Sequence, residues 1–341
     1  MAPRQKSDRV TIKTVAEDAG VSVAAVSKVL RDAYGVSEAL RARVQASMEK
    51  LSYRPHAAAR GMRGQTYTLG VILPDIHNPF FTDIVAGVNT ALERTQYQPL
   101  FGIGYSVVGT EQALVEAMMD RQMDGIIFLG PRLAPVVLEA IGRRIPLATI
   151  AHHTETGFYD SVNDDDVLGG MLVVQHLVAA GFRNITMISL ALHADDHAQV
   201  PTRREVGYRR AMEEADLKRY IKVVPAEQTA REVQAAVRQL LRSRGRPEAI
   251  FCWTDFIALE VLSVARELGL SVPGDLAIVG YDNTSYCDLA QNALTSVDQS
   301  GQVLGLQAAR LLIERIKGRE TPEHFVMTPR LVARASSRRV G

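Results

Sequence analysis

Residues 11–30 read TIKTVAEDAGVSVAAVSKVL, and this stretch predicts two short helices joined by a very short turn. Apolar residues recur at helical spacing behind Thr11, which is a suitable N-cap, and the pattern stops at Gly20. Ser22 is a good N-cap for a second helix over residues 23–30. Because so little chain separates the two helices, they must cross steeply.

The second of these helices has two faces of different character. One face carries the apolar residues that a core needs, and the other is formed by Val23, Ala24, Ser27 and Lys28. A third helical pattern begins after Ser37 and completes a small three-helix unit. A helix exposed in this way can enter the major groove of DNA, and a helical hairpin with a purely structural role is the alternative.

The first 64 residues are basic although the whole chain is nearly neutral. They hold 12 Lys and Arg against 6 Asp and Glu, a net charge of +6, whereas residues 65–341 hold 27 against 32, a net charge of −5. Lys and Arg gain affinity for nucleic acid by displacing counterions from phosphates. The asymmetry therefore indicates a nucleic-acid-binding module joined to another kind of domain, and a basic domain that is merely solvated is the alternative.

Length and composition exclude several classes of protein. A chain of 341 residues is long enough for two or three domains, and 47% hydrophobic with 23% charged residues is ordinary for a globular protein. No stretch approaches the roughly 18 consecutive apolar residues of a membrane span. A polar N-terminus and only two cysteines, Cys252 and Cys287, lead us to expect a cytoplasmic protein that works at the nucleoid.

From residue 68 onward, short apolar runs alternate with amphipathic helical patterns, which is typical of parallel α/β layers. In a first layered domain we expect strands at 69–73, 99–103, 125–129 and 147–150, with helices at 81–94, 111–121 and 135–143. In a second we expect strands at 185–189, 221–224, 249–252 and 277–281, with helices at 167–180, 204–215, 232–244 and 256–268. A strand at 294–297 and a helix at 304–316 are candidates to cross back between the two domains.

The segment between the basic module and the first strand, residues 54–64, reads RPHAAARGMRG. Pro55 suits the first turn of a helix and three alanines favour its continuation. A helix this short is not stable alone, and Gly61 weakens it further. We therefore predict a conditional helix.

These motifs resemble those of the lactose-repressor (LacI/GalR) family. The run quoted above, with VSEALRARVQASMEKLSYRP after it, is similar to the family's helix-turn-helix, whose usual pattern is TIxDVAxxAGVSxxTVSRVLN. AAARGMRG resembles the family's hinge helix, and LGVILPDIHNPFF resembles its first strand and effector loop. TRREVGY resembles its RxxGF/Y motif, and CWTDFIAL with LGLSVPGDLAIVGYDN resembles its C-terminal core signature. The resemblance covers almost the whole chain.

The resemblance implies an α/β protein with an N-terminal three-helix helix-turn-helix DNA-binding domain and a hinge helix. A periplasmic-binding-protein-like core of two doubly wound α/β subdomains follows. Residues 1–53 would form the DNA-binding domain and residues 54–65 the hinge helix and linker. The core N-subdomain would comprise residues 66–161 and 297–319, and the C-subdomain residues 162–296 and 320–341.

The resemblance also implies which residues contact DNA. They are Thr11, Ser22, Val23, Ala24, Ser27, Lys28, Tyr53, Arg54, Ala59, Arg60 and Met62. Ala25 and Lys28 stand where the family usually has Thr and Arg, and both departures bear on the operator sequence. Met62 replaces the Leu that normally wedges into the minor groove, which makes the wedge longer and more flexible while keeping it apolar.

For the effector, the resemblance implies a cleft between the core subdomains, at the C-terminal ends of the strands. The residues that carry over are Asp75, Asn78, Phe80, Phe81, His152, Arg204, Asp255 and Gln299. Aromatic rings stack on sugars or bases, Arg204 offers a rigid fork of donors, and Asp255 offers two acceptor oxygens.

These residue types favour a sugar or sugar derivative over a purine. The structural alternatives are helix capping by Asn78, core packing of the phenylalanines, and an ion pair for Arg204 and Asp255.

Two polar clusters suggest a metal enzyme as an alternative function. His152 and His153 precede the acidic residues 164–166, and His193 and His197 would share one face of a helix. The chain lacks HExxH, GxSxG and a Walker loop, so we expect no enzyme, no cofactor and no metal. A free-standing sugar-binding receptor is the second alternative, and the basic first module opposes it.

We therefore expect an effector-responsive transcriptional regulator, most simply a repressor, that binds a pseudo-palindromic operator in double-stranded DNA. One short recognition helix reads only a half-site, so the protein should be a homodimer. A tetramer of the kind found in one branch of the family would need a C-terminal leucine-heptad helix, which residues 333–341 cannot form. We expect the helix after Phe80, through Ile84 and Val88, to contribute to the dimer interface.

Overall fold

The computed structural model describes residues 10–30, 33–53, 65–190, 199–226 and 229–338. The chain divides into two compact units, Met1–Thr66 and Tyr67–Gly341, which we call the head and the core. The predicted hinge segment, with Arg54, Ala59, Arg60 and Met62, lies outside the described residues, as do His193 and His197.

The head contains the three predicted helices. They are α1 (Ile12–Asp18), α2 (Val23–Leu30) and α3 (Glu38–Lys50). Small and β-branched residues from all three, among them Val15, Val26 and Val44, form its buried core. Gly20, at a φ of +62°, makes the tight turn between α1 and α2, a conformation that costs glycine little. The predicted steep helix pair therefore forms around a well-packed apolar centre.

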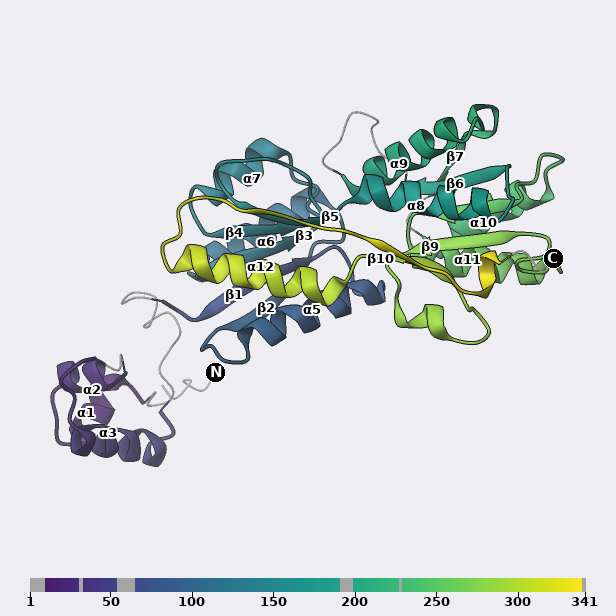
Figure 1. Ribbon diagram of the computed structural model, residues 1–341. Helices are drawn as coiled ribbons and strands as arrows, with labels where there is room; N and C mark the ends of the chain where they lie inside the picture. Colours follow the sequence, from purple (N-terminus) through teal and green to yellow (C-terminus); the bar gives the residue numbers. More distant parts are fainter. Residues whose placement is uncertain (1–9, 31–32, 54–64, 191–198, 227–228, 339–341) are drawn as a thin grey trace, which may run out of the picture. The chain divides into compact units, whose positions relative to one another are not determined.

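The first part of the core, the N-subdomain, is built on a six-stranded parallel sheet in the order β11-β5-β4-β3-β1-β2 (Figure 1). Its strands are β1 (Thr68–Leu73), β2 (Gln98–Ile103), β3 (Gly125–Leu129), β4 (Leu147–Ile150), β5 (Asp160–Asp164) and β11 (His324–Met327). One face is covered by α5 (Pro79–Leu92) and α12 (Gly301–Ile316), and the other by α6 (Val108–Asp120) and α7 (Pro135–Gly142). The sheet is thus buried on both faces, as parallel sheets usually are.

The C-subdomain repeats this plan with the strand order β12-β10-β9-β8-β6-β7. Its strands are β6 (Ile185–Leu190), β7 (Lys222–Ala226), β8 (Ala249–Cys252), β9 (Ala277–Tyr281), β10 (Thr295–Asp298) and β12 (Arg330–Val332). Pairing is parallel except where β12 runs antiparallel to β10. The helices α8 (Asp166–Ala179) and α9 (Val200–Glu214) cover one face, and α10 (Ala230–Arg242) and α11 (Asp255–Glu267) the other. Short 3₁₀ turns occupy Lys218–Tyr220, Ser285–Asp288 and Ala335–Ser337.

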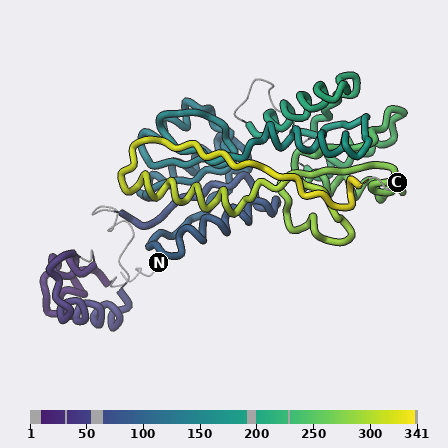
Figure 2. Tube along the Cα trace, in the orientation of Figure 1, coloured from purple at the N-terminus to yellow at the C-terminus, as the bar shows by residue number. Residues whose placement is uncertain are grey.

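The chain passes between the two subdomains three times, after β5, after β10 and after β11; the yellow trace in Figure 2 follows the last of these passages. The predicted subdomain boundaries are wrong at three places. Residues 162–164 belong to β5 and residues 324–327 to β11, both in the N-subdomain sheet, whereas residues 297–298 belong to β10 in the C-subdomain sheet. Strand β5 escaped prediction because its sequence, DSVND, is polar. Strand β11 escaped because it lies at the sheet edge, half-exposed, and lacks the continuous apolar run of a buried strand.

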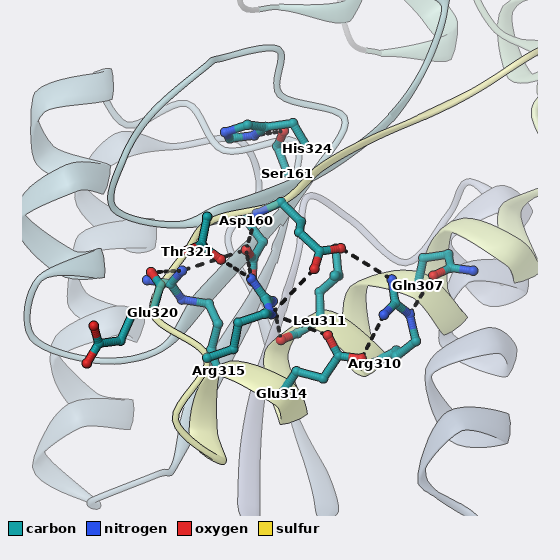
Figure 3. A network of polar contacts seen from close by, with 12 residues as sticks. Asp160, Ser161, Gln307, Arg310, Leu311, Glu314, Arg315, Glu320, Thr321 and His324 are labelled. Carbon is teal, nitrogen blue, oxygen red and sulfur yellow. Dashed lines mark hydrogen bonds and ion pairs between the residues drawn. The ribbon is translucent and has the colours of Figure 1, made fainter.

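Strand β5 can be polar because its carboxylates have partners. The buried Asp160 accepts hydrogen bonds from Arg319 Nη1 (3.0 Å) and Nη2 (2.8 Å) and from the backbone N–H of Glu323 (2.8 Å), as Figure 3 shows in part. Beside it, the Ser161 hydroxyl lies 2.8 Å from His324 Nδ1. These contacts hold β11 against β5, so residues late in the sequence complete the sheet of the N-subdomain.

Helices α5 and α12 of the N-subdomain pack with their backbones in close approach. A Cβ atom added to Gly305 would lie 2.0 Å from the carbonyl oxygen of Ile84, and one added to Gly87 would lie 1.9 Å from that of Gln302. Ile84 and Val88 are therefore fully buried inside the subunit. The predicted role of these two residues in a dimer interface is wrong, because α12 already covers them.

Candidate functional site

The head presents the N-terminal half of α2 to solvent. The side chains of Val23, Ala24 and Lys28 are exposed, and Val26 and Val29 face the core. Ser27 is the exception among the residues predicted to contact DNA, because it is only 8% exposed and lies at the edge of the core face. An exposed helix start with a basic residue one turn later suits insertion into the major groove.

Three other residues predicted to contact DNA have structural partners in the head. Thr11 caps α1 through a reciprocal pair of bonds with Thr14, and the Ser22 hydroxyl accepts a bond from Ala25 N–H at the start of α2 (3.1 Å). Tyr53 packs half-buried against the head core. Thr11 and Ser22 are exposed to solvent, whereas Tyr53 is only partly so.

The core holds a cavity of about 550 Å³ between its two subdomains. This volume lies in the range of small-molecule sites. Most of its walls come from loops that follow the C-terminal ends of strands, where open α/β sheets bind ligands. The lining residues include Asp75, Asn78, Phe80, Phe81, Tyr105, Arg132, Gln199, Arg204, Trp253, Phe256, Asp282 and Gln299.

The loop after β1 contributes four residues that the sequence predicted. The Asp75 carboxylate accepts bonds from the N–H groups of His77 (2.6 Å) and Asn78 (2.9 Å), which fixes the turn. Asn78 caps α5 by accepting the N–H of Phe80 (3.0 Å). Its amide also donates to Asp282 Oδ2 (3.1 Å) in the other subdomain, so Asn78 both caps a helix and spans the cavity.

The two phenylalanines of this loop differ in burial. Phe80 is 5% exposed and belongs to the N-subdomain core, while Phe81 is half-buried against it, with ring centroids 6.3 Å apart. Both nevertheless line the cavity. The core-packing alternative therefore applies mainly to Phe80, and Phe81 is the better platform for a flat ligand.

Arg204, on α9, is the cation at the centre of the site. It is 3% exposed; Nε donates to Asp166 Oδ1 (2.7 Å) and Nη1 to the backbone carbonyl of Trp253 (2.5 Å). The guanidinium carbon lies 3.4 Å from the centroid of the Tyr281 ring. Burial alone lowers the pKa of Arg204, but Asp166 and the other acidic groups nearby raise it above its ordinary value. The group is permanently charged and held in one orientation.

Asp282 follows β9 and was not predicted as a site residue. Its Oδ1 accepts from Gln299 Nε2 (2.7 Å) and lies 3.8 Å from Arg204 Nη1, and its Oδ2 accepts from Asn78. Burial raises the pKa of Asp282 well above its ordinary value, although Arg204 opposes the shift. Its φ of +112° is rare outside glycine, and such strain is typical of binding sites. An acidic residue directly after a predicted strand was the signal that could have found it.

Asp255 and His152 do not line the cavity, so the prediction that they bind effector directly is wrong. Asp255 is 1% exposed, and its oxygens accept bonds from Ser296 Oγ (2.6 Å), Thr284 N–H (2.7 Å) and Cys287 Sγ (3.0 Å). A carboxylate engaged in this way has little capacity left for a ligand. His152 is likewise buried, and its backbone N–H donates to Asn163 Oδ1 (2.8 Å).

Behind Arg204 lies a second layer of buried charge at the junction of the subdomains. Asp166 is the first residue of α8, and its Oδ1 accepts the hydrogen bond from Arg204 Nε. Its Oδ2 lies 2.6 Å from Nε2 of His153 in the N-subdomain. Burial raises the pKa of Asp166, but Arg204 and His153 together lower it below its ordinary value. Burial and the neighbouring Asp166 raise the pKa of Asp164 to about 8; its Oδ2 accepts the Tyr281 hydroxyl (2.5 Å).

The described residues contain no group of three or more His, Cys, Asp or Glu side chains placed to hold a metal ion. Within the same residues, no helix is both long enough and apolar enough to cross a membrane. What the described part of the chain offers is an exposed helix on a basic head and a cavity lined by aromatic rings, amides, two arginines and two aspartates. These are the parts of a binding protein.

Known proteins share both parts. The profile of "Bacterial regulatory proteins, lacI family" matches residues 11–56, and that of "Periplasmic binding protein-like domain" matches residues 174–337. Catabolite control protein A of Priestia megaterium is 33% identical over 324 residues, which cover 94% of this chain and 96% of that protein.

Two solved structures extend the comparison. The transcriptional regulator CelR in complex with cellobiose has a TM-score of 0.70 and 28% identity, covering 96% of this chain and 100% of that chain. The lac repressor dimer bound to operator and the anti-inducer ONPF has a TM-score of 0.83, 24% identity, and coverage of 97% and 99%. The latter likeness is one of fold.

Proposed function

The chain belongs to the lacI family of bacterial regulatory proteins, and we propose that it is a dimeric transcriptional repressor controlled by a small, sugar-like effector. One observation supports the proposal: the same chain carries an exposed recognition helix and a cavity lined by side chains of both core subdomains. A regulator of this kind works where the DNA is, so we place it in the cytoplasm.

We assign the reading of the operator to α2. Val23 and Ala24 meet base edges in the major groove, and Lys28 adds positive charge to the contact surface. Thr11 and Ser22, whose hydroxyls cap the ends of helices, meet the phosphates beside the groove. Two heads related by a twofold axis read the two halves of a pseudo-palindromic operator, because a single short helix reads only one half-site.

A second copy of the chain is the partner that fits the apolar edge of the N-subdomain. Strand β2 lies at the edge of its sheet, and Leu100 and Phe101 on it are 46% and 47% exposed. Val107 and Val108, just before and at the start of α6, are exposed as well. An apolar cluster on an unpaired strand edge is a surface that monomeric proteins avoid. This cluster replaces Ile84 and Val88 as the proposed dimer surface.

The effector acts by binding one arrangement of the subdomains better than another. Asn78 from the N-subdomain and Asp282 from the C-subdomain share a hydrogen bond across the cavity, so a ligand that enters there competes with a contact that joins the two. The ligand shifts the equilibrium between the two subdomain arrangements only by the difference between its binding free energies for them. The same free energy appears as a change in operator affinity.

The test of the proposed function is operator binding with a labelled DNA fragment from the protein's own promoter region, followed by fluorescence anisotropy. We expect nanomolar binding that weakens steeply with salt. Lys28→Ala should weaken it and lower the salt slope by about 0.9 for each phosphate that is no longer neutralised. Lys222→Ala removes the same charge from an exposed position on the core and should change neither value.

Cellobiose, the ligand in the similar CelR complex, is the first candidate effector for a panel of neutral sugars added to this assay. A sugar that binds the cavity should change the anisotropy midpoint of wild-type protein. DNA binding that Lys28→Ala leaves intact would refute the assignment of α2.

A further inference from the structure

The charge of Arg204 is already balanced inside the protein. Asp166 is completely buried, and the two side chains meet at 2.7 Å between Nε and Oδ1. Both oxygens of Asp166 are engaged, since Oδ2 lies 2.6 Å from His153 Nε2. As the first residue of α8, Asp166 also lies at the positive end of a helix dipole, which favours its ionised form. The cation that a ligand meets in the cavity therefore comes with a fixed anion behind it.

The other charges around the cavity show the same balance. Among the described lining residues, the two arginines, Arg132 and Arg204, face two acidic residues, Asp75 and Asp282. The backbone N–H of Arg132 donates to the buried Glu111 (2.9 Å). Burial raises the pKa of Glu111, although the charge of Arg132 opposes the shift. Asp75 in the wall and Asp166 behind it match the two arginines, so the described wall holds no surplus of positive charge for an anion.

The hydrogen bonds of Arg204 leave a donor for an uncharged ligand. Its Nε and Nη1 are used by Asp166 and by the carbonyl of Trp253, whereas Nη2 makes no hydrogen bond to a described residue. Two N–H groups on Nη2 suit a hydroxyl, ring or carbonyl oxygen. A phosphate or carboxylate at the same place would come close to the ionised Asp166, and like charges in a desolvated site repel strongly.

We propose that Asp166 is a specificity-determining residue that serves as the internal counter-ion of Arg204, so that the cavity selects an uncharged effector and rejects phosphorylated or carboxylated ones. This inference rests on the proposed function, because it concerns the effector of the same cavity. It narrows the effector to neutral sugars and other uncharged molecules with oxygen acceptors and a face that stacks on aromatic rings. Specificity of this kind comes from repulsion of the wrong ligand as much as from attraction of the right one.

The chain carries its own reporter for this test. Trp253 is the only tryptophan of the sequence; it lines the cavity, and its carbonyl accepts the Arg204 bond. Sodium sulfate, titrated into the full-length protein against sodium chloride of equal ionic strength, is the anionic probe. The wild-type emission should follow the chloride control, without a saturable change, up to tens of millimolar sulfate.

Asp166→Asn removes the counter-ion while keeping the shape of the side chain. In this variant, Arg204 loses its directly hydrogen-bonded carboxylate, and Asp282, 3.8 Å from Nη1, is the nearest remaining acidic group. Sulfate should then produce a saturable change in Trp253 emission, with affinity at least tenfold above any residual binding by the wild type. Asp165→Asn is the matched control: Asp165 caps α8 by accepting the N–H of Leu168, and the variant loses the same charge one residue away from the Arg204 contact. It should behave as the wild type does.

Three results would overturn the proposal: saturable sulfate binding at Trp253 by the wild type, a folded Asp166→Asn protein that ignores sulfate, or an equal gain by Asp165→Asn. If Asp166→Asn fails to fold, the wild-type titration decides, with glucose 6-phosphate as a second anionic probe. Operator binding is measured on the same preparations. If the wild type binds both operator and sulfate, the counter-ion proposal is wrong and the proposed function stands. If it does not bind sulfate and also fails to bind operator, the proposed function is wrong.

Discussion

Replacing Gly305 by alanine tests the close packing of α5 and α12, on which the N-subdomain depends. The new Cβ atom would lie 2.0 Å from the carbonyl oxygen of Ile84, whereas ordinary contact begins at 3.4 Å. The two helices must therefore move apart by about 1.4 Å, and a close-packed interior has no space to absorb that shift. The atom in the way belongs to the backbone, so no change of side-chain rotamer relieves the clash.

The cost of such overpacking is about 1–3 kcal/mol or more, against a gain of up to about 1 kcal/mol from replacing a helical glycine. We expect Gly305→Ala to lower the free energy of unfolding of the core by about 2 kcal/mol. With a urea m-value of about 1–3 kcal/mol per molar, the midpoint should fall by about 1 M. Urea titration followed by Trp253 fluorescence measures this midpoint, because Trp253 lies in the core.

Gly109→Ala is the matched control for this experiment. Gly109 lies in α6, and a Cβ atom added there meets nothing within 4 Å. Gly109 is the second residue of α6, so the substitution should raise the stability by less than the roughly 1 kcal/mol of an interior helical glycine and should not lower it. If both variants move the midpoint in the same direction, or if Gly305→Ala is as stable as the wild type, the packing argument fails.

Three further predictions concern charge and assembly. In the folded protein the pKa of Asp164 is raised from 3.8 to about 8, so Asp164 keeps a proton that the unfolded chain releases, and its stabilising contribution falls as pH rises from about 4 to about 8. Asp164→Asn should therefore weaken the dependence of the thermal unfolding midpoint on pH in this range. An unchanged pH dependence would contradict the prediction. Arg319→Ala removes two hydrogen bonds from the buried Asp160, which keeps Arg315 Nη1 at 3.7 Å and the N–H of Glu323, and should cost about 1.5–3 kcal/mol in urea unfolding. Arg310→Ala, which breaks exposed pairs with Glu314 and Glu323, should cost less than about 1 kcal/mol. Leu100→Asp should turn a dimer into a monomer by light scattering, and a dimer of undiminished stability would exclude the β2 edge as the interface.

Much of the fold could be predicted from hydrophobic periodicity. The strands Gly125–Leu129, Leu147–Ile150, Ala249–Cys252 and Ala277–Tyr281 lie where the apolar runs place them, because both faces of each are buried. Strand β5 could not be found in this way. It is buried although polar, and its burial depends on Arg319, which is far away in the sequence.

The site was predicted less completely than the fold, for a related reason. The position of Asp255 after a predicted strand correctly suggests nearness to the cleft, but Ser296 and Thr284, which occupy its oxygens, come from segments that no local pattern connects to it. Asp166 shows the opposite case. Its place at a helix N-terminus is a sufficient local explanation for an acidic residue, and only the fold brings it to Arg204. Sequence patterns locate the strand ends, and tertiary contacts decide which side chains remain free for a ligand.

The late segments α12 and β11 belong to the N-subdomain, and this affects how the protein folds during its synthesis on the ribosome. The head can fold as soon as it emerges, because its three helices use only local contacts. The first sheet emerges early as well, yet the face that α5 and α12 share stays partly uncovered until α12 has been made, and the sheet edge stays open until β11 arrives. A nascent chain that stalls before residue 301 therefore has a folded head and an incompletely folded core. Such a product exposes apolar surface to chaperones and proteases, and it lacks the completed subdomain on which pairing with a second copy depends.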